Sequence, residues 1–151
     1  MVSRLTQSVD KTDKKLRWAS LILAMLGVLD SIYLLIYKFS SNDKLCLGSG
    51  DCATVNYSPY SEIYGIPVSL LGVIGYAAIV AVLALESRLR LLQEYGRLAN
   101  FGMSLVGVLF SAYLTYVEAF ILHAYCPFCV TSAIIITVIF IVSIIRLIKT
   151  F

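Results

Sequence analysis

Residues 126–145 have the sequence CPFCVTSAIIITVIFIVSII, which joins a pair of cysteines to a long apolar run. From Pro127 to Ile145 the run contains no charged residue, and it approaches the roughly 20 residues that a helix needs to cross a bilayer. Inside lipid such a segment must be helical, because an isolated strand would leave its backbone polar groups unpaired. The stretch therefore predicts a membrane-spanning helix that begins within the C-x-x-C motif.

The composition of the whole chain agrees with a membrane protein. Hydrophobic residues make up 60% of the 151 residues, charged residues make up 14%, and the mean hydropathy is +0.88. Soluble domains are nearer half apolar and a quarter charged. We predict a single all-α membrane domain over residues 1–151, a bundle of four transmembrane helices. A long loop on the outer side, at about 38–66, joins the first helix to the second. The predicted spans lie at about 18–37, 67–85, 98–122 and 127–145.

The distribution of lysine and arginine predicts the orientation. Five lie in the N-terminal tail, three between the second and third spans and two in the C-terminal tail, whereas the other side has only Lys38 and Lys44. Because cytoplasmic loops carry the excess of positive charge, we expect both termini in the cytoplasm, in a plasma (inner) membrane. All four cysteines then face the periplasm or exterior, where disulfides persist. The alternative is an inverted chain with reduced thiols in the cytosol. A lipid bilayer is expected around the chain, and no nucleic-acid partner.

The four cysteines form two pairs. Cys46 and Cys52 flank Gly48-Ser49-Gly50, which makes the loop tip flexible. Cys126 and Cys129 stand at a helix N-terminus, whose partial positive charge stabilises a thiolate. Two dithiols on one side of a membrane indicate a relay by thiol–disulfide exchange towards a lipid-soluble acceptor. Two alternatives stay open: a non-enzymatic membrane protein with structural disulfides, and a zinc site, for which the C-x5-C spacing is unusual.

The second half of the outer loop predicts a short helix lying at the membrane interface. Ser58 and Pro59 are typical of a helix start, and Gly65 of a helix end before Pro67 opens the next span. Three tyrosines would share one face of this helix at the interface, or would form an ordinary aromatic belt: Tyr57, Tyr60 and Tyr64. In the third span Gly107, Ser111 and Thr115 form a small-residue stripe that predicts close helix packing.

Three segments together resemble the vitamin K epoxide reductase family in its stand-alone prokaryotic form. They are residues 52–58 (CATVNYS), residues 64–72 (YGIPVSLLG), and residues 111–114 (SAYL) running into the C-x-x-C motif. The resemblance covers nearly the whole chain. Since the chain ends at Phe151, just past the fourth span, we expect no fused thioredoxin domain and a separate redox partner.

The resemblance implies a role for each cysteine. Cys126 and Cys129 would be the active-site pair, with Cys129 nearer the ring of a menaquinone, phylloquinone or ubiquinone type of quinone from the membrane pool. Cys46 would meet a thioredoxin-fold partner on the outer side, and Cys52 would exchange with Cys126. The expected activity is a quinone-linked thiol oxidation that supports disulfide formation. The residues expected near the quinone are Cys129, Ser58, Ser61, Tyr64 and Tyr113.

Two departures from the family bear on the substrate. Animal members have an asparagine where this chain has Ser61, and a tyrosine where it has Ala133. We therefore expect simple quinone reduction rather than epoxide reduction. Quinone reduction also consumes two protons, so the ionisable residues at the outer end are candidates for proton delivery. They are Asp30, Glu118 and His123, with structural or surface roles as the alternative. No metal site is expected.

Overall fold

The computed structural model describes residues 2–40, 59, 62–86, 88–123 and 127–150. Four long helices dominate it: α1 (Val2–Ser40), α3 (Val68–Leu85), α4 (Arg90–Tyr116) and α5 (Pro127–Thr150). Each contains a segment long and apolar enough to cross a membrane. The predicted all-α bundle of four transmembrane helices is thus confirmed.

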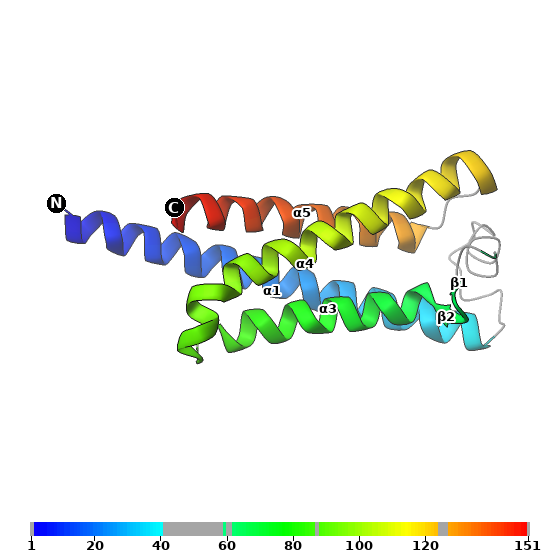
Figure 1. Ribbon diagram of the computed structural model, residues 1–151, viewed down its shortest axis with the longest axis horizontal. Helices are drawn as coiled ribbons and strands as arrows, with labels where there is room; N and C mark the ends of the chain where they lie inside the picture. The colour runs from blue at the N-terminus through cyan, green and yellow to red at the C-terminus, as the bar shows by residue number, and fades with distance from the viewer. Residues whose placement is uncertain (1, 41–58, 60–61, 87, 124–126, 151) are drawn as a thin grey trace.

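The helices run up and down in sequence order (Figure 1). Each packs against its neighbours in the chain, and α1 also packs against α5, so that α3 and α5 lie on one diagonal of the bundle. Both ends of the chain and the α3–α4 connection lie at one end, which we call the termini end (Figure 1). The start of α5 lies at the opposite end, the cysteine end.

The bundle has a narrow apolar core and an apolar outside. Seven buried side chains form the central cluster, which draws on α1, α3 and α5: Ala24, Tyr76, Ile79, Leu83, Ile135, Ile136 and Ile139. Large apolar side chains such as Ile22, Leu109 and Ile134 are more than half exposed. Exposure of such residues all around a helical bundle is expected where lipid, not water, covers the outer surface.

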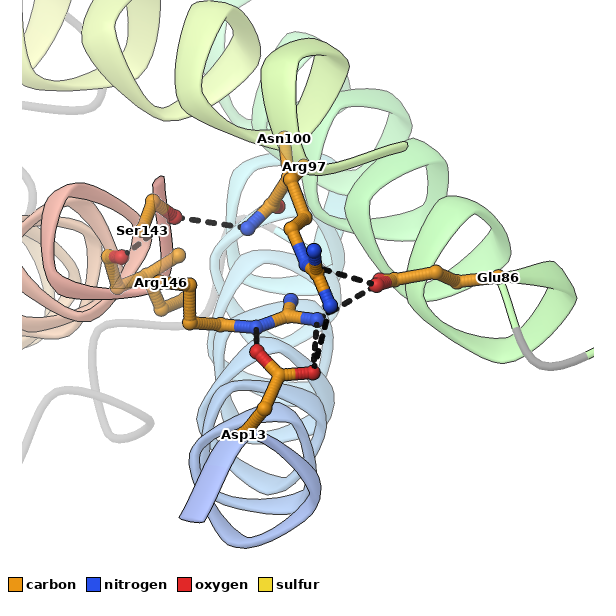
Figure 2. Close-up of polar contacts among 7 residues, drawn as sticks. Asp13, Glu86, Arg97, Asn100, Ser143 and Arg146 are labelled. Atoms are coloured by element: carbon orange, nitrogen blue, oxygen red, sulfur yellow. Dashed lines mark hydrogen bonds and ion pairs between the residues drawn. The ribbon is translucent and has the colours of Figure 1, made fainter. Parts of the chain in front are cut away.

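Charged side chains join all four helices at the termini end, in what we call the charge cluster (Figure 2). Arg146 of α5 bonds to Asp13 of α1 and to Glu86, which caps the C-terminus of α3. Arg97 of α4 pairs with Asp13 at 3.2 Å. Next to them the Asn100 amide donates a 2.7 Å hydrogen bond to the Ser143 hydroxyl. The attraction between these buried charges of opposite sign offsets the cost of removing them from water.

The predicted interfacial helix is wrong at its C-terminal end, over residues 62–65. Strands β1 (Glu62–Ile63) and β2 (Ile66–Pro67) form a small antiparallel hairpin. The two turn residues, Tyr64 and Gly65, both have positive φ, 53° and 81°, as in the tight turns that suit hairpins. Tyr64 is fully exposed and lies in this turn, not on a helix. Apart from Pro59, the remainder of the predicted helix lies outside the described residues.

Candidate functional site

A cavity of about 630 Å³ lies between the four helices, from the start of α5 to the middle of the bundle. Its walls are mainly aliphatic and come chiefly from α3 and α4, with one side completed by α1 and α5. Its size and apolar lining are typical of a site for a small organic molecule. The side chains with polar atoms on its wall are Ser31, Ser69, Tyr76, Ser111, Thr115, Glu118, Cys129 and Ser132.

Cys129 lies on the wall of this cavity, in the first turn of α5. The turn is held in place by Phe128, whose ring packs against Tyr33 of α1 with centroids 4.6 Å apart. The Thr131 hydroxyl donates to the carbonyl of Pro127 at 2.8 Å, which adds a bond within the same turn. A thiolate at this position benefits from the positive end of the α5 dipole. The sulfur therefore meets the cavity at a fixed and electrostatically favourable place.

Tyr76 crosses the bundle on its diagonal. Its ring covers Gly27 of α1, where a Cβ would collide with it, and its hydroxyl reaches Ser132 of α5. The hydroxyl oxygen lies 2.9 Å from the Ser132 carbonyl oxygen and 2.9 Å from the Ser132 hydroxyl. Ser132 follows Cys129 by three residues and so lies on the same face of α5. Sequence reasoning missed Tyr76, although a tyrosine in the middle of an apolar span was a visible signal.

Glu118 lies on the cavity wall at the cysteine end and is only 3% exposed. It belongs to η3 (Val117–Leu122), a π-helical turn that continues α4. Such turns are rare and occur often at functional sites. His123 ends η3 in a left-handed conformation, with φ 51°, and its N–H donates to the Glu118 carbonyl. The sequence identified Glu118 as a candidate, but no pattern in it indicated a π-turn.

The other two candidates for proton delivery lie elsewhere. Asp30 of α1 is half-buried and is not part of the cavity wall. One of its carboxylate oxygens is buried and has no hydrogen-bond partner within the described part of the chain. The His123 side chain is exposed, beyond the cavity wall. Of the three, the structure thus brings only Glu118 to the cavity with Cys129.

Two tyrosines expected near a quinone do not line the cavity. Tyr113 of α4 is 50% exposed on the outer surface of the bundle, and Tyr64 is exposed at the tip of the hairpin. The remaining expected site residues lie outside the described residues: Cys46, Cys52, Ser58, Ser61 and Cys126. Within residues 2–40, 62–86, 88–123 and 127–150, no group of three His, Cys, Asp or Glu side chains could hold a metal ion.

The small-residue stripe of α4 contributes to both packing and the cavity. A Cβ on Gly107 would lie 2.8 Å from Ile136 of α5, so the two helices approach closely there. Gly107, Ser111 and Thr115 also form part of the cavity wall. Small side chains on α4 thus leave the space that larger ones would fill.

Comparison with known proteins agrees with this arrangement. The model of the vitamin K epoxide reductase family matches residues 18–144, which include all of α3, α4 and η3 and most of α1 and α5. The chain belongs to the vitamin K epoxide reductase family. It is also 31% identical over 112 residues to the thiol-disulfide oxidoreductase LTO1 of Arabidopsis thaliana. That match covers 70% of this chain but 30% of the Arabidopsis relative. This chain therefore corresponds to less than a third of that relative's length.

Proposed function

We propose that this protein is a membrane thiol:quinone oxidoreductase that supports disulfide formation outside the cytoplasm. Electrons would pass from a secreted thioredoxin-fold partner to Cys46 and Cys52, then to Cys126 and Cys129, and then to quinone. The observation that carries the proposal is that Cys129 lines an apolar cavity of about 630 Å³ inside a membrane bundle. Family membership and the name of the Arabidopsis relative support thiol–disulfide chemistry.

The residues around the cavity fit a quinone. A quinone has a flat apolar ring, an apolar tail and two carbonyl oxygens that accept hydrogen bonds. The aliphatic wall formed by α3 and α4 suits the ring and tail, and the hydroxyls on the wall suit the oxygens. A site of this kind, mostly apolar with a few placed polar groups, is the usual design for a small organic ligand.

The chemistry of the two half-reactions matches. Oxidation of two thiols to one disulfide releases two electrons and two protons, and a bound quinone supplies the acceptor for both. Cys129 holds the donor sulfur at the cavity wall, Phe128 and Tyr33 fix the turn that carries it, and the walls around it are mainly apolar. Glu118, buried on the same wall, would hold a proton close to the acceptor.

The geometry also supports the proposed orientation. The start of α5, whose first turn carries Cys129, lies at the end of the bundle opposite the two chain termini (Figure 1). The termini end carries ten of the twelve lysines and arginines, which favours its placement in the cytoplasm. The cysteine end would then face the periplasm or exterior, where a secreted partner can reach it.

The test is anaerobic reduction of quinone by the purified full chain. A dithiol donor and 2-methyl-1,4-naphthoquinone or a short-chain benzoquinone are mixed with the protein, and the quinone absorbance is followed. We expect donor-dependent bleaching in the wild type that disappears in Cys129→Ser and in Cys126→Ser. Bleaching at wild-type rate in these variants would exclude the proposed route. No bleaching with either quinone, with the cysteines in unreactive disulfides, would favour a structural role instead.

A further inference from the structure

The hydroxyl groups of Tyr76 and Ser132 form a pair on the cavity wall that no motif in the sequence marks. We propose that this hydroxyl pair binds one carbonyl oxygen of the quinone and holds the ring beside Cys129. The inference rests on the proposed function and deepens it, because it names the residues that orient the acceptor.

The hydroxyl pair has one hydrogen that can be redirected to a ligand. Together Tyr76 and Ser132 carry two hydroxyl hydrogens. One is used when the Tyr76 hydroxyl donates to the Ser132 carbonyl oxygen at 2.9 Å. The other then lies between the two hydroxyl oxygens, which are 2.9 Å apart. An acceptor that enters the cavity can take this second hydrogen in exchange for the bond between the two hydroxyls, while the Ser132 carbonyl keeps its bond from Tyr76.

The position of the pair relative to Cys129 suits a quinone ring. Cys129 and Ser132 are three residues apart on α5, which places their Cβ atoms about 5–6 Å apart on one face of the helix. That separation is roughly the width of the ring. Both residues and Tyr76 form part of the cavity wall. A ring whose oxygen is bound by the hydroxyl pair is thereby held against the sulfur.

The pair is also held rigidly. The Tyr76 side chain is 6% exposed, and its ring packs against Gly27 of α1. The hydroxyl is therefore anchored on α1 and α3 and bonded to α5, so its direction is set before any ligand binds. Donors fixed in advance stabilise negative charge on an oxygen better than donors that must reorganise. The effect is larger in a cavity of low polarity than in water.

This role fits the balance of the proposed reaction. The Cys126 and Cys129 thiols lose two electrons and two protons as the S–S bond between them forms. Both protons end on the two oxygens of the acceptor, which becomes a quinol. The hydroxyl pair ends the reaction with the two hydrogens it began with. It acts by binding and polarising one oxygen, and no further oxidant or reductant is needed.

The experiment compares Tyr76→Phe, Ser132→Ala and the double variant with the wild type. Tyr76→Phe keeps the ring on Gly27 and removes only the hydroxyl, after which the Ser132 hydroxyl can turn to a carbonyl of its own helix. Ser132→Ala leaves the single hydroxyl hydrogen of Tyr76 shared between two acceptors, the backbone carbonyl of residue 132 and the quinone oxygen. We expect each variant to raise the Kd of 2-methyl-1,4-naphthoquinone about fivefold. The Kd of the double variant should be little higher than that of Tyr76→Phe, because the two hydroxyls act as a unit.

A second readout follows the hydrogen bond itself. The naphthoquinone, carrying carbon-13 at its carbonyls, is bound to the oxidised protein, and the infrared band of each carbonyl is recorded. We expect one band to lie at lower wavenumber in the wild type and to move up in Tyr76→Phe. Tyr95→Phe is the matched control, because it removes the hydroxyl of an exposed tyrosine on α4 away from the cavity.

The outcomes separate the two proposals. An unchanged Kd and an unchanged carbonyl band in Tyr76→Phe would overturn the role of the pair, while donor-dependent reduction in the wild type would still support the enzyme. If Tyr76→Phe does not fold, Ser132→Ala decides in the same way. Absence of quinone reduction in the wild type would instead remove the proposed function, whatever the band positions show.

Discussion

Arg146 donates a 2.6 Å hydrogen bond from Nη2 to Oε1 of Glu86, and both side chains are almost wholly buried. The bond joins α5 to the C-terminal cap of α3, two helices that lie on a diagonal of the bundle. Nε of the same guanidinium donates to Oδ1 of Asp13 at 3.0 Å, which adds α1 (Figure 2). Arg146 therefore fixes three helices at the termini end, as Tyr76 does nearer the cysteines.

Removal of Arg146 should destabilise the bundle strongly. Arg146→Ala leaves the Glu86 carboxylate buried without its main cation, and breaking a buried pair in this way costs about 3–5 kcal/mol. We expect a clear loss in the free energy of unfolding, measured by titration of a mild detergent solution with a denaturing detergent. Lys149→Ala is the control, since Lys149 lies on α5 but is exposed.

Arg97 provides a graded comparison within the charge cluster. It is 28% exposed and pairs with Asp13, which Arg146 also binds. Arg97→Ala should therefore lower the free energy of unfolding by less than Arg146→Ala does. Equal losses would show that the cluster does not depend on the burial of Arg146.

The sequence was sufficient to predict the four spans, because hydropathy over about 20 residues reports directly on burial in lipid. It failed at Tyr64 and Gly65. Tyrosines at helical spacing suggested a helix, whereas two positive φ values at these residues form a hairpin turn. A glycine at the second of the two residues between Ile63 and Ile66 was the overlooked hairpin signal.

The candidate site was only partly predictable, because local sequence patterns report motifs and buried charges but not how the helices pack. Motif spacing indicated Cys129, and a charge inside an apolar span indicated Glu118. Both lie on the cavity wall. Tyr113 is expected near a quinone by resemblance and lies half exposed on the outer surface of α4. The direction of its side chain depends on the rotation of α4, which a motif does not report. Tyr76 and Ser132 are 56 residues apart, so only the packing of α3 across from α5 brings them together.

Gly27 should be sensitive to the smallest enlargement. A Cβ at this position would overlap the ring of Tyr76, and overpacking of this kind typically costs about 1–3 kcal/mol. Gly27→Ala should therefore lower the free energy of unfolding and displace the Tyr76 hydroxyl. Gly102→Ala is the control for stability, since its added Cβ would meet no atom within 4 Å beyond its chain neighbours and its own helix backbone. Equal stability of the two variants would contradict the close approach of α1 and α3.

Glu118 should contribute to turnover more than Asp30. Glu118→Gln keeps the shape of the side chain but removes a buried group that can carry a proton at the cavity wall. If Glu118 delivers protons, the rate of quinone reduction should fall by about a hundredfold with little change in the Kd of the quinone. Asp30→Asn, outside the cavity wall, should have a smaller effect on the rate. The reverse order would assign proton delivery to Asp30.

The shuttle cysteines should be distinguishable from the active-site pair by the choice of electron donor. If Cys46 receives electrons only from a protein partner, Cys46→Ala should lose activity with a reduced thioredoxin-fold protein. It should keep most of its activity with a small dithiol, which can reach Cys126 and Cys129 directly. Both rates are measured from quinone absorbance under anaerobic conditions.

Cys129→Ala is the matched comparison for this prediction. It removes the sulfur at the cavity wall, so activity should disappear with either donor, while the protein partner should still be captured through the loop cysteines as a mixed disulfide. Equal loss with both donors in Cys46→Ala would argue against a shuttle. In that case the loop pair and the C-x-x-C pair would have to act together in every transfer, because a donor that bypasses the loop would gain nothing.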